Sequence, residues 1–361
     1  MDVRLSTEQC ELRDQAARIS GRLGPSTVAS LGDSERSAKL DAALAQAGWR
    51  ELRVPVERGA PSATAVAVGI VAEQLARGLA DTAFLGPTLA AELRRLAGAP
   101  EATSTETVAL RPDLSGPALA GEPAVALDAF CDSSALVLVP SEGNWTLGSV
   151  AIGGRGGGVD LTRPASPIAP GAASRVPGQT KPISSCGMRQ WTALGLATSC
   201  ADLVGTMQGA LDTSVEYARN RRQYARPIGS FQAVQHLLAD VAVALEGSRS
   251  TALHAAWSVD AVEPGDALAF TAAAKAYCSR AAVAACETAI QVHGGIGNTW
   301  ECVAHLYLRR ALLSRDVLGG VGPSLRRVLE HAGVPSARGE GARGEGARGE
   351  GARGEGGDGL R

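Results

Sequence analysis

The sequence predicts a mainly α-helical protein with a small β domain in the middle of the chain. Apolar residues recur at helical spacing towards both ends, and short β-branched or apolar runs separated by Gly, Pro, Ser and Asn lie between them. The 361 residues, 45% of them hydrophobic, suffice for compact units with a large core. Four regions are predicted: an N-terminal helical domain (1–104), a reduced antiparallel β domain (105–180), a C-terminal helical bundle (181–334) and a tail (335–361).

The N-terminal region is expected to contain several helices. The side chain of Ser6 or Thr7 can accept hydrogen bonds from the free N–H groups at the start of the first helix. Apolar residues at helical spacing predict further helices over Val66–Leu79 and Thr88–Leu96. Trp49 is expected where a helix ends.

The middle region is expected to form short strands over Thr107–Leu110, Ala135–Val139 and Trp145–Val150. The glycine-rich run Gly153–Gly158 lies among them and invites interpretation as a phosphate-binding loop. No strand-to-helix pattern surrounds it and no Lys-Ser/Thr pair follows it, so a hairpin or loop is the favoured interpretation.

The C-terminal region is expected to contain long helices. An apolar stripe at helical spacing predicts one helix; its residues are Phe231, Val234, Leu238, Val241 and Leu245. Pro264 suits the first turn of a second helix that runs to Val292. Short connections between long helices favour an antiparallel four-helix bundle. The Ala-Arg-Gly-Glu-Gly repeat in Ala337–Gly356 cannot bury a core, so the tail is predicted to be disordered.

Composition excludes several classes of function. A net charge of -2 gives no bulk attraction to nucleic acid. The seven cysteines show no CxxC pair and no paired spacing with histidine, so zinc is not indicated, and reduced thiols in a cytoplasmic protein are expected. The first residues lack the apolar segment of a signal peptide, and no run approaches the roughly 20 apolar residues of a membrane helix.

Two motifs carry the functional prediction. Arg221–Gln232 reads RRQYARPIGSFQ, and Gln291–Gly297, about sixty residues later, reads QVHGGIG. Together they resemble the paired flavin-contacting signatures of acyl-CoA dehydrogenases, and residues 1–334 resemble that family in their order of helices, β domain and helical bundle. The resemblance implies FAD as cofactor and α,β-dehydrogenation of an acyl-CoA thioester. It also implies an electron-transfer acceptor.

Seven residues of these motifs are candidate FAD contacts: Arg221, Gln223, Tyr224, Gln232, Gln291, Gly294 and Gly295. An arginine fork can bind the pyrophosphate, glutamine amides can bind phosphate, ribose or adenine, and a tyrosine ring can pack against a ring of the ligand. Glycines allow close approach of the backbone. Taken singly, Arg221 can be a solvated charge and the glycine pair a helix terminator.

The catalytic glutamate of the family has no counterpart at its usual positions, which read Gly195 and Leu318 here. Asp202 and Asp316 are weak substitutes. The β domain also lacks the family's Thr/Ser-rich segment and the Trp-bearing strand that hold the flavin ring. Four histidines are expected to be ordinary packed or partly exposed side chains: His236, His254, His305 and His331.

These features lead to the hypothesis of a heteromeric acyl-CoA dehydrogenase. The chain retains the signature residues that would contact the FAD of a neighbouring subunit. It lacks the base and the β-domain segments that would serve a flavin ring of its own. In this respect the chain resembles subunits of some actinobacterial acyl-CoA dehydrogenases that act on steroid side chains. The expected substrate is therefore a bulky acyl-CoA, and the expected assembly is a heterotetramer. A homo-oligomeric, self-sufficient flavoenzyme on a biosynthetic acyl thioester, with an unconventional base, is the second interpretation. A catalytically silent scaffold subunit is the third.

Overall fold

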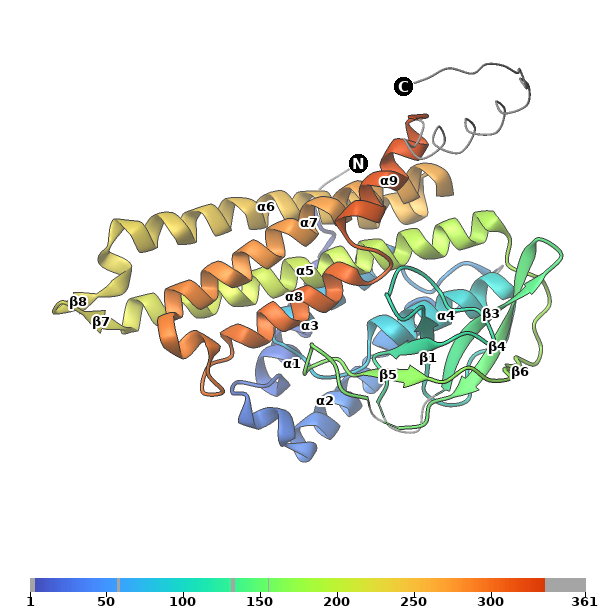
Figure 1. Ribbon diagram of the computed structural model, residues 1–361, viewed down its shortest axis with the longest axis horizontal. Helices are drawn as coiled ribbons and strands as arrows, with labels where there is room; N and C mark the ends of the chain where they lie inside the picture. The colour runs from blue at the N-terminus through green and yellow to red at the C-terminus, as the bar shows by residue number, and fades with distance from the viewer. Residues whose placement is uncertain (1–3, 57–58, 131–133, 155, 335–361) are drawn as a thin grey trace, which may run out of the picture.

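The computed structural model describes residues 4–56, 59–130, 134–154 and 156–334 (Figure 1). The elements run in the predicted order of helices, sheet and helices. The repeat tail, which was predicted to be disordered, lies outside the described residues. No helix in the described ranges is long and apolar enough to cross a bilayer.

Four α-helices form the N-terminal part: α1 (Thr7–Leu23), α2 (Ser34–Gln46), α3 (Ala65–Arg77) and α4 (Leu85–Ala97). The predicted cap at Ser6 is confirmed, because its side chain accepts from the Gln9 N–H while the Gln9 side chain accepts from the Ser6 N–H. Short 3₁₀ helices occupy Ala29–Gly32 and Trp49–Glu51, so the buried Trp49 lies just beyond α2 rather than within it.

The middle region forms a six-stranded sheet in the order β5-β2-β1-β3-β4-β6. Its strands are β1 (Glu106–Leu110), β2 (Ala124–Leu127), β3 (Ser134–Ser141), β4 (Asn144–Ala151), β5 (Ala165–Ile168) and β6 (Ser174–Arg175). The prediction of a wholly antiparallel sheet is wrong, because β1 pairs in parallel with β3. The chain turns back along β2 and returns, so β3 starts beside the start of β1, with Glu106 opposite Ser134.

The glycine-rich run lies between two strands. β4 ends at Ala151 and β5 begins at Ala165, so no helix follows the glycines directly. A phosphate-binding loop places its amide groups at the start of a helix. The interpretation of this run as a loop between strands is therefore confirmed for its described residues.

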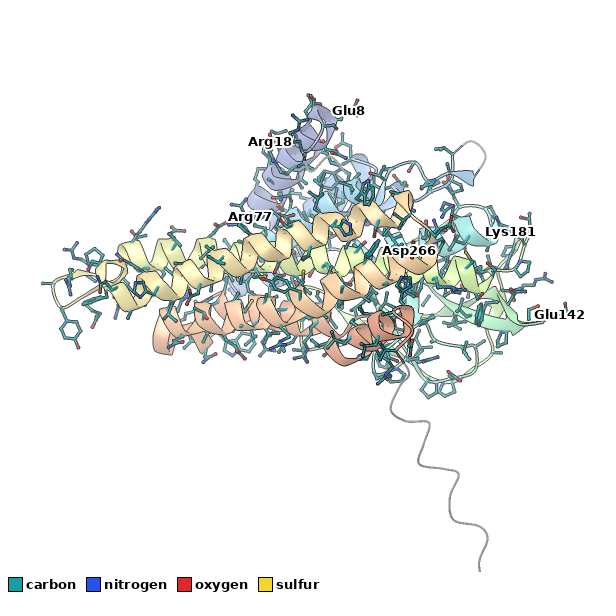
Figure 2. All side chains as sticks on the ribbon, turned by 90° about the horizontal axis from the view of Figure 1, so that it is seen from above. Glu8, Arg18, Arg77, Glu142, Lys181 and Asp266 are labelled. Atoms are coloured by element: carbon teal, nitrogen blue, oxygen red, sulfur yellow. The ribbon has the colours of Figure 1, made fainter. Side chains whose placement is uncertain are left out.

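The C-terminal part contains five helices: α5 (Ser185–Asn220), α6 (Gln232–Ala261), α7 (Pro264–His293), α8 (Ala304–Asp316) and α9 (Val321–His331). The helices α5 to α8 pack together as the predicted four-helix bundle, and α9 lies on α7 (Figure 1). A hairpin of β7 (Arg222–Gln223) and β8 (Arg226–Pro227) projects from one end of the bundle. Figure 2 shows Glu142 and Lys181 at the opposite end, on and beside the sheet.

The largest apolar core joins all three parts of the chain. Leu89 from α4, Trp191 from α5 and Leu318 after α8 are fully buried members of it. The Trp191 indole donates to the Leu89 carbonyl oxygen over 2.9 Å, which ties α5 to α4. This core extends from the sheet into the bundle, and it contains Leu318, one of the two positions at which a base was sought; the other, Gly195, packs against it.

Candidate functional site

The two sequence signatures meet at the hairpin end of the bundle. The first begins where α5 ends, the second spans the end of α7, and both helices end there (Figure 1). The ring of Tyr217, in the last turns of α5, stacks on His293 at the end of α7 with 4.5 Å between ring centroids. Segments more than sixty residues apart therefore form one surface.

All seven candidate FAD contacts are exposed on this surface or beside it. Arg221 is held through its backbone, because its N–H donates to Tyr217 and its carbonyl oxygen accepts from Ile228, both over 2.8 Å. Among the described residues, no carboxylate forms an ion pair with its guanidinium. The backbone of Arg221 is thus held in place, while its charge remains open to a ligand from outside the chain.

The turn of the hairpin holds its residues in an unusual conformation. Tyr224 and Ala225 both have positive φ, +51° and +65°, which matches the turn expected between twisted strands but costs energy for residues with a Cβ. The Tyr224 ring is 89% exposed, with its edge towards Phe231 at 6.2 Å between centroids. Strain of this kind concentrates at ligand-binding segments, and here it presents an aromatic ring to the outside.

The glycine pair ends a helix and leaves its backbone accessible. Gly294 caps α7 with φ +65°, a conformation that favours glycine, so it is a helix terminator. A Cβ at Gly294 or at Gly295 would meet no atom of the described chain within 4 Å. The backbone here faces open space, and an external ligand can approach it closely.

The positions without a base lie against each other. A Cβ on Gly195 would lie 2.2 Å from Cδ1 of Leu318 and 3.3 Å from Cδ2 of Leu89. Leu318 is completely buried with φ +58°, so its side chain is turned into the core from a left-handed backbone. Apolar packing therefore fills the place where a carboxylate was expected from either position.

Adding a methyl group at Gly195 tests this packing. Gly195→Ala is expected to lower the free energy of unfolding by about 1–2 kcal/mol, because overpacking costs about 1–3 kcal/mol and alanine's better helix propensity offsets part of it. In a Leu318→Ala background the added methyl should cost nothing or stabilise. Urea denaturation of the two single variants and the double variant measures this, and additive effects would contradict it.

Asp202 is part of a buried network of charges between the sheet and the bundle. Its carboxylate accepts from Arg310 at 2.7 Å and from the Ser314 hydroxyl at 2.6 Å. Arg163, which precedes β5, lies 3.6 Å from Asp202 and donates to Asp128 at 2.8 Å. Burial alone would raise the pKa of Asp202, but the two arginines outweigh it and lower the pKa. Asp202 is therefore a structural anion and does not serve as the missing base.

Asp316, the other candidate for the catalytic base, and the cavity beside the network do not provide a base either. Asp316 ends α8 and pairs with Arg315, and 43% of its side chain is exposed. The cavity beside Asp202, Arg163 and Arg310 measures about 10 Å³, which is about the volume of one water molecule.

A buried lysine, Lys275, donates to the carbonyl oxygens of Ser314 and Val317 (the latter over 3.0 Å) and so holds the turn that leads to Leu318. Burial lowers the pKa of Lys275 to about 8.

The described residues offer groups suited to the diphosphate half of FAD but no space for its ring beside the base positions. The surface of Arg221 and Gly294 offers an open cation and accessible backbone, as a diphosphate requires. Between sheet and bundle, the ion pairs of Asp202 and the packing of Leu318 against Gly195 and Leu89 fill the space beside the base positions among the described residues. Sequence reasoning missed Arg163 and Lys275, since single cations within apolar segments carry no motif.

Comparison with known proteins gives consistent matches. Residues 193–330 match the family described as "Acyl-CoA dehydrogenase, C-terminal domain". The chain is 32% identical over 330 residues to "Acyl-CoA dehydrogenase IpdE2" of Mycobacterium tuberculosis, covering 87% of this chain and 93% of that protein. It is 40% identical over 205 residues to "Acyl-CoA dehydrogenase FadE34" of the same organism, covering 55% of this chain but only 28% of FadE34.

Two solved structures have the same fold. A variant of the "Tcur3481-Tcur3483 steroid ACAD" superposes with a TM-score of 0.75 at 21% identity, covering 90% of this chain and 98% of the other. The ChsE4-ChsE5 complex from Mycobacterium tuberculosis contains a chain with a TM-score of 0.72 at 22% identity, covering 93% and 100%. At these identities the likeness concerns the fold alone.

Proposed function

Because this chain belongs to the acyl-CoA dehydrogenase family, whose cofactor is FAD, yet lacks a base at Gly195 and Leu318, we propose that it is one subunit of a heteromeric acyl-CoA dehydrogenase. The observation that carries the proposal is the contrast between the two ends of the bundle. At the hairpin end, Arg221 and the backbone at Gly294 are open to a ligand from another chain. Near the sheet, the described residues fill the space beside Gly195 and Leu318.

In the proposed complex the FAD is anchored in a partner subunit that has a complete β domain and a catalytic glutamate. Arg221 would bind the pyrophosphate in fork geometry, and Gln223, Gln232 and Gln291 would hydrogen-bond phosphate, ribose or adenine. When bound, FAD accepts the β-hydrogen of the substrate as hydride. The residues of this chain would hold and orient the cofactor, while the α-proton passes to the partner's carboxylate.

The proposed substrate is the CoA thioester of a bulky, steroid-like acid. This proposal rests on the likeness to a steroid dehydrogenase structure, and the complex named ChsE4-ChsE5 supports an assembly of two kinds of subunit. An electron-transfer acceptor would reoxidise the flavin. The pocket for the acyl group would be formed largely by the partner, since Leu89, Trp191 and Leu318 close the corresponding space here.

Co-expression with a second dehydrogenase-like chain tests the function. The lone chain is expected to purify colourless or flavin-poor, whereas the complex is expected to be yellow and to transfer electrons from a steroid acyl-CoA to a dye. Flavin near stoichiometry with turnover by the lone chain would favour the self-sufficient flavoenzyme. A stable complex without flavin would favour the silent scaffold.

A further inference from the structure

An open hollow lies on the outer side of α8, directly after the second signature. It has a volume of about 400 Å³ and is lined by Val159, Asn298, Trp300, His305, Leu308, Arg309 and Leu312. Asn298 is the last residue of the 3₁₀ helix Gly294–Asn298, so the hollow and the glycine pair share one segment. The proposed FAD surface therefore continues along the chain into this hollow.

His305 provides a buried polar group without a partner. Its side chain is only 8% exposed, and its Nε2 atom makes no hydrogen bond within the described part of the chain. Leaving such a group unsatisfied costs about 1–3 kcal/mol. Burial and, next, the Arg309 cation lower the pKa of His305, so at neutral pH the imidazole is neutral and Nε2 can carry a proton to donate.

Arg309 and Trp300 complete the polar side of the hollow. The guanidinium carbon of Arg309 lies 5.7 Å from the centre of the Trp300 ring, and one guanidinium nitrogen donates to the Val159 carbonyl oxygen over 3.2 Å. Within the described ranges no carboxylate pairs with Arg309. Trp300 is 64% exposed although its ring also packs edge-on against His305, with 5.2 Å between centroids.

The side chains of Trp300, His305 and Arg309 are suited to bind a carboxylate side chain of another protein. A carboxylate can accept hydrogen bonds from the Arg309 guanidinium and from a protonated Nε2 of His305, and it would pair with the guanidinium charge, which has no carboxylate partner in the described ranges. Tryptophan and arginine are enriched among the residues that contribute most of the binding energy at protein interfaces. Leu308 and Leu312 offer an apolar floor, whereas a small-molecule site would enclose most of its ligand.

We propose that the Trp300–His305–Arg309 hollow receives an aspartate or glutamate side chain of the partner subunit. The proposal rests on the heteromeric function proposed above and assigns the assembly contact to residues outside the candidate FAD contacts. It separates two roles on neighbouring surfaces: the hairpin end holds the cofactor, and the hollow holds the partner.

Two variants test the hollow in the co-expressed complex. Arg309→Glu would place a carboxylate against the partner's carboxylate, and Trp300→Ala would remove a ring that is 64% exposed. Each should reduce co-purified partner at least tenfold. Arg18→Glu is the matched control, because Arg18 is exposed on α1, well away from the hairpin end in Figure 2. An unchanged thermal unfolding midpoint of each lone variant shows that folding is intact.

Cross-linking identifies the occupant. A photoreactive p-benzoyl-phenylalanine at position 300 is expected to cross-link to a partner segment that contains an acidic residue, and reversing the charge of that residue should restore assembly with Arg309→Glu. Full assembly of both variants would overturn the proposal while leaving the heteromeric function intact, and no complex with the unmodified chain would overturn both. Binding of ADP or succinate by the lone chain, abolished in Arg309→Glu while assembly persists, would assign the hollow to a small anion and also overturn it.

Discussion

Replacing Arg221 with alanine is expected to weaken FAD binding by the assembled complex about 10- to 100-fold. The Arg221 backbone is held by two hydrogen bonds at the end of α5, and its guanidinium has no carboxylate partner in the described chain. A hydrogen bond to a charged group contributes about 1.5–3 kcal/mol, and each 1.4 kcal/mol is a factor of ten in affinity. Equilibrium dialysis of FAD against the complex gives the dissociation constant directly.

The control for this prediction lies at the other end of the same helix. Arg189 is also exposed on α5, but close to the sheet rather than to the hairpin. Arg189→Ala should leave the affinity for FAD unchanged. If the two alanine variants retain the same flavin load in the same amount of complex, Arg221 does not bind the cofactor.

Replacing Asp202 with asparagine is expected to lower the free energy of unfolding by about 3–5 kcal/mol. The substitution keeps the shape of the side chain but leaves Arg163 and Arg310 buried without their shared anion. Removing one partner of a buried ion pair is far more costly than the pair itself is stabilising, because an uncompensated charge remains in the interior. Urea denaturation followed by circular dichroism measures the change.

An exposed ion pair between α3 and α5, the helix that carries Asp202, provides the comparison. Arg77 and Asp212 pair over 2.7 Å with side chains 46% and 43% exposed, and Figure 2 labels Arg77 beside the bundle. Exposed pairs contribute about 0–1 kcal/mol, so Asp212→Asn should be nearly neutral. Equal losses in the two variants would mean that Asp202 is more accessible to solvent than its ion pairs indicate.

The same network predicts how stability depends on pH. The pKa of Asp202 is lowered in the folded protein, so its contribution is fully present above the unfolded value of about 3.9 and is lost as the pH falls towards the lowered pKa. Between about pH 4 and pH 2, stability should therefore decrease less steeply in Asp202→Asn than in the unmodified chain. Parallel curves over that range would show that another carboxyl group controls the acid transition.

Much of the architecture could be predicted because it depends on local pattern. Helical spacing predicted the helices α3, α4 and α6, Pro264 predicted the start of α7, and β-branched or apolar runs predicted the strands β1, β3 and β4. The pairing of those strands could not be predicted, because composition does not specify which neighbour a strand joins. The parallel pairing of β1 with β3 depends on the path of the chain between them.

The candidate site divides in the same way. From the sequence alone came the two signatures, the family and the missing base at Gly195 and Leu318, because motifs are runs of neighbouring residues. Only the tertiary structure decided that Leu318 fills the space at Gly195. It also showed that the Asp202 carboxylate forms ion pairs with Arg163 and Arg310. In the described chain, Nε2 of His305 is buried without a hydrogen-bond partner. Those contacts join segments far apart in the chain, and burial and charge pairing exist only once folding has brought the segments together.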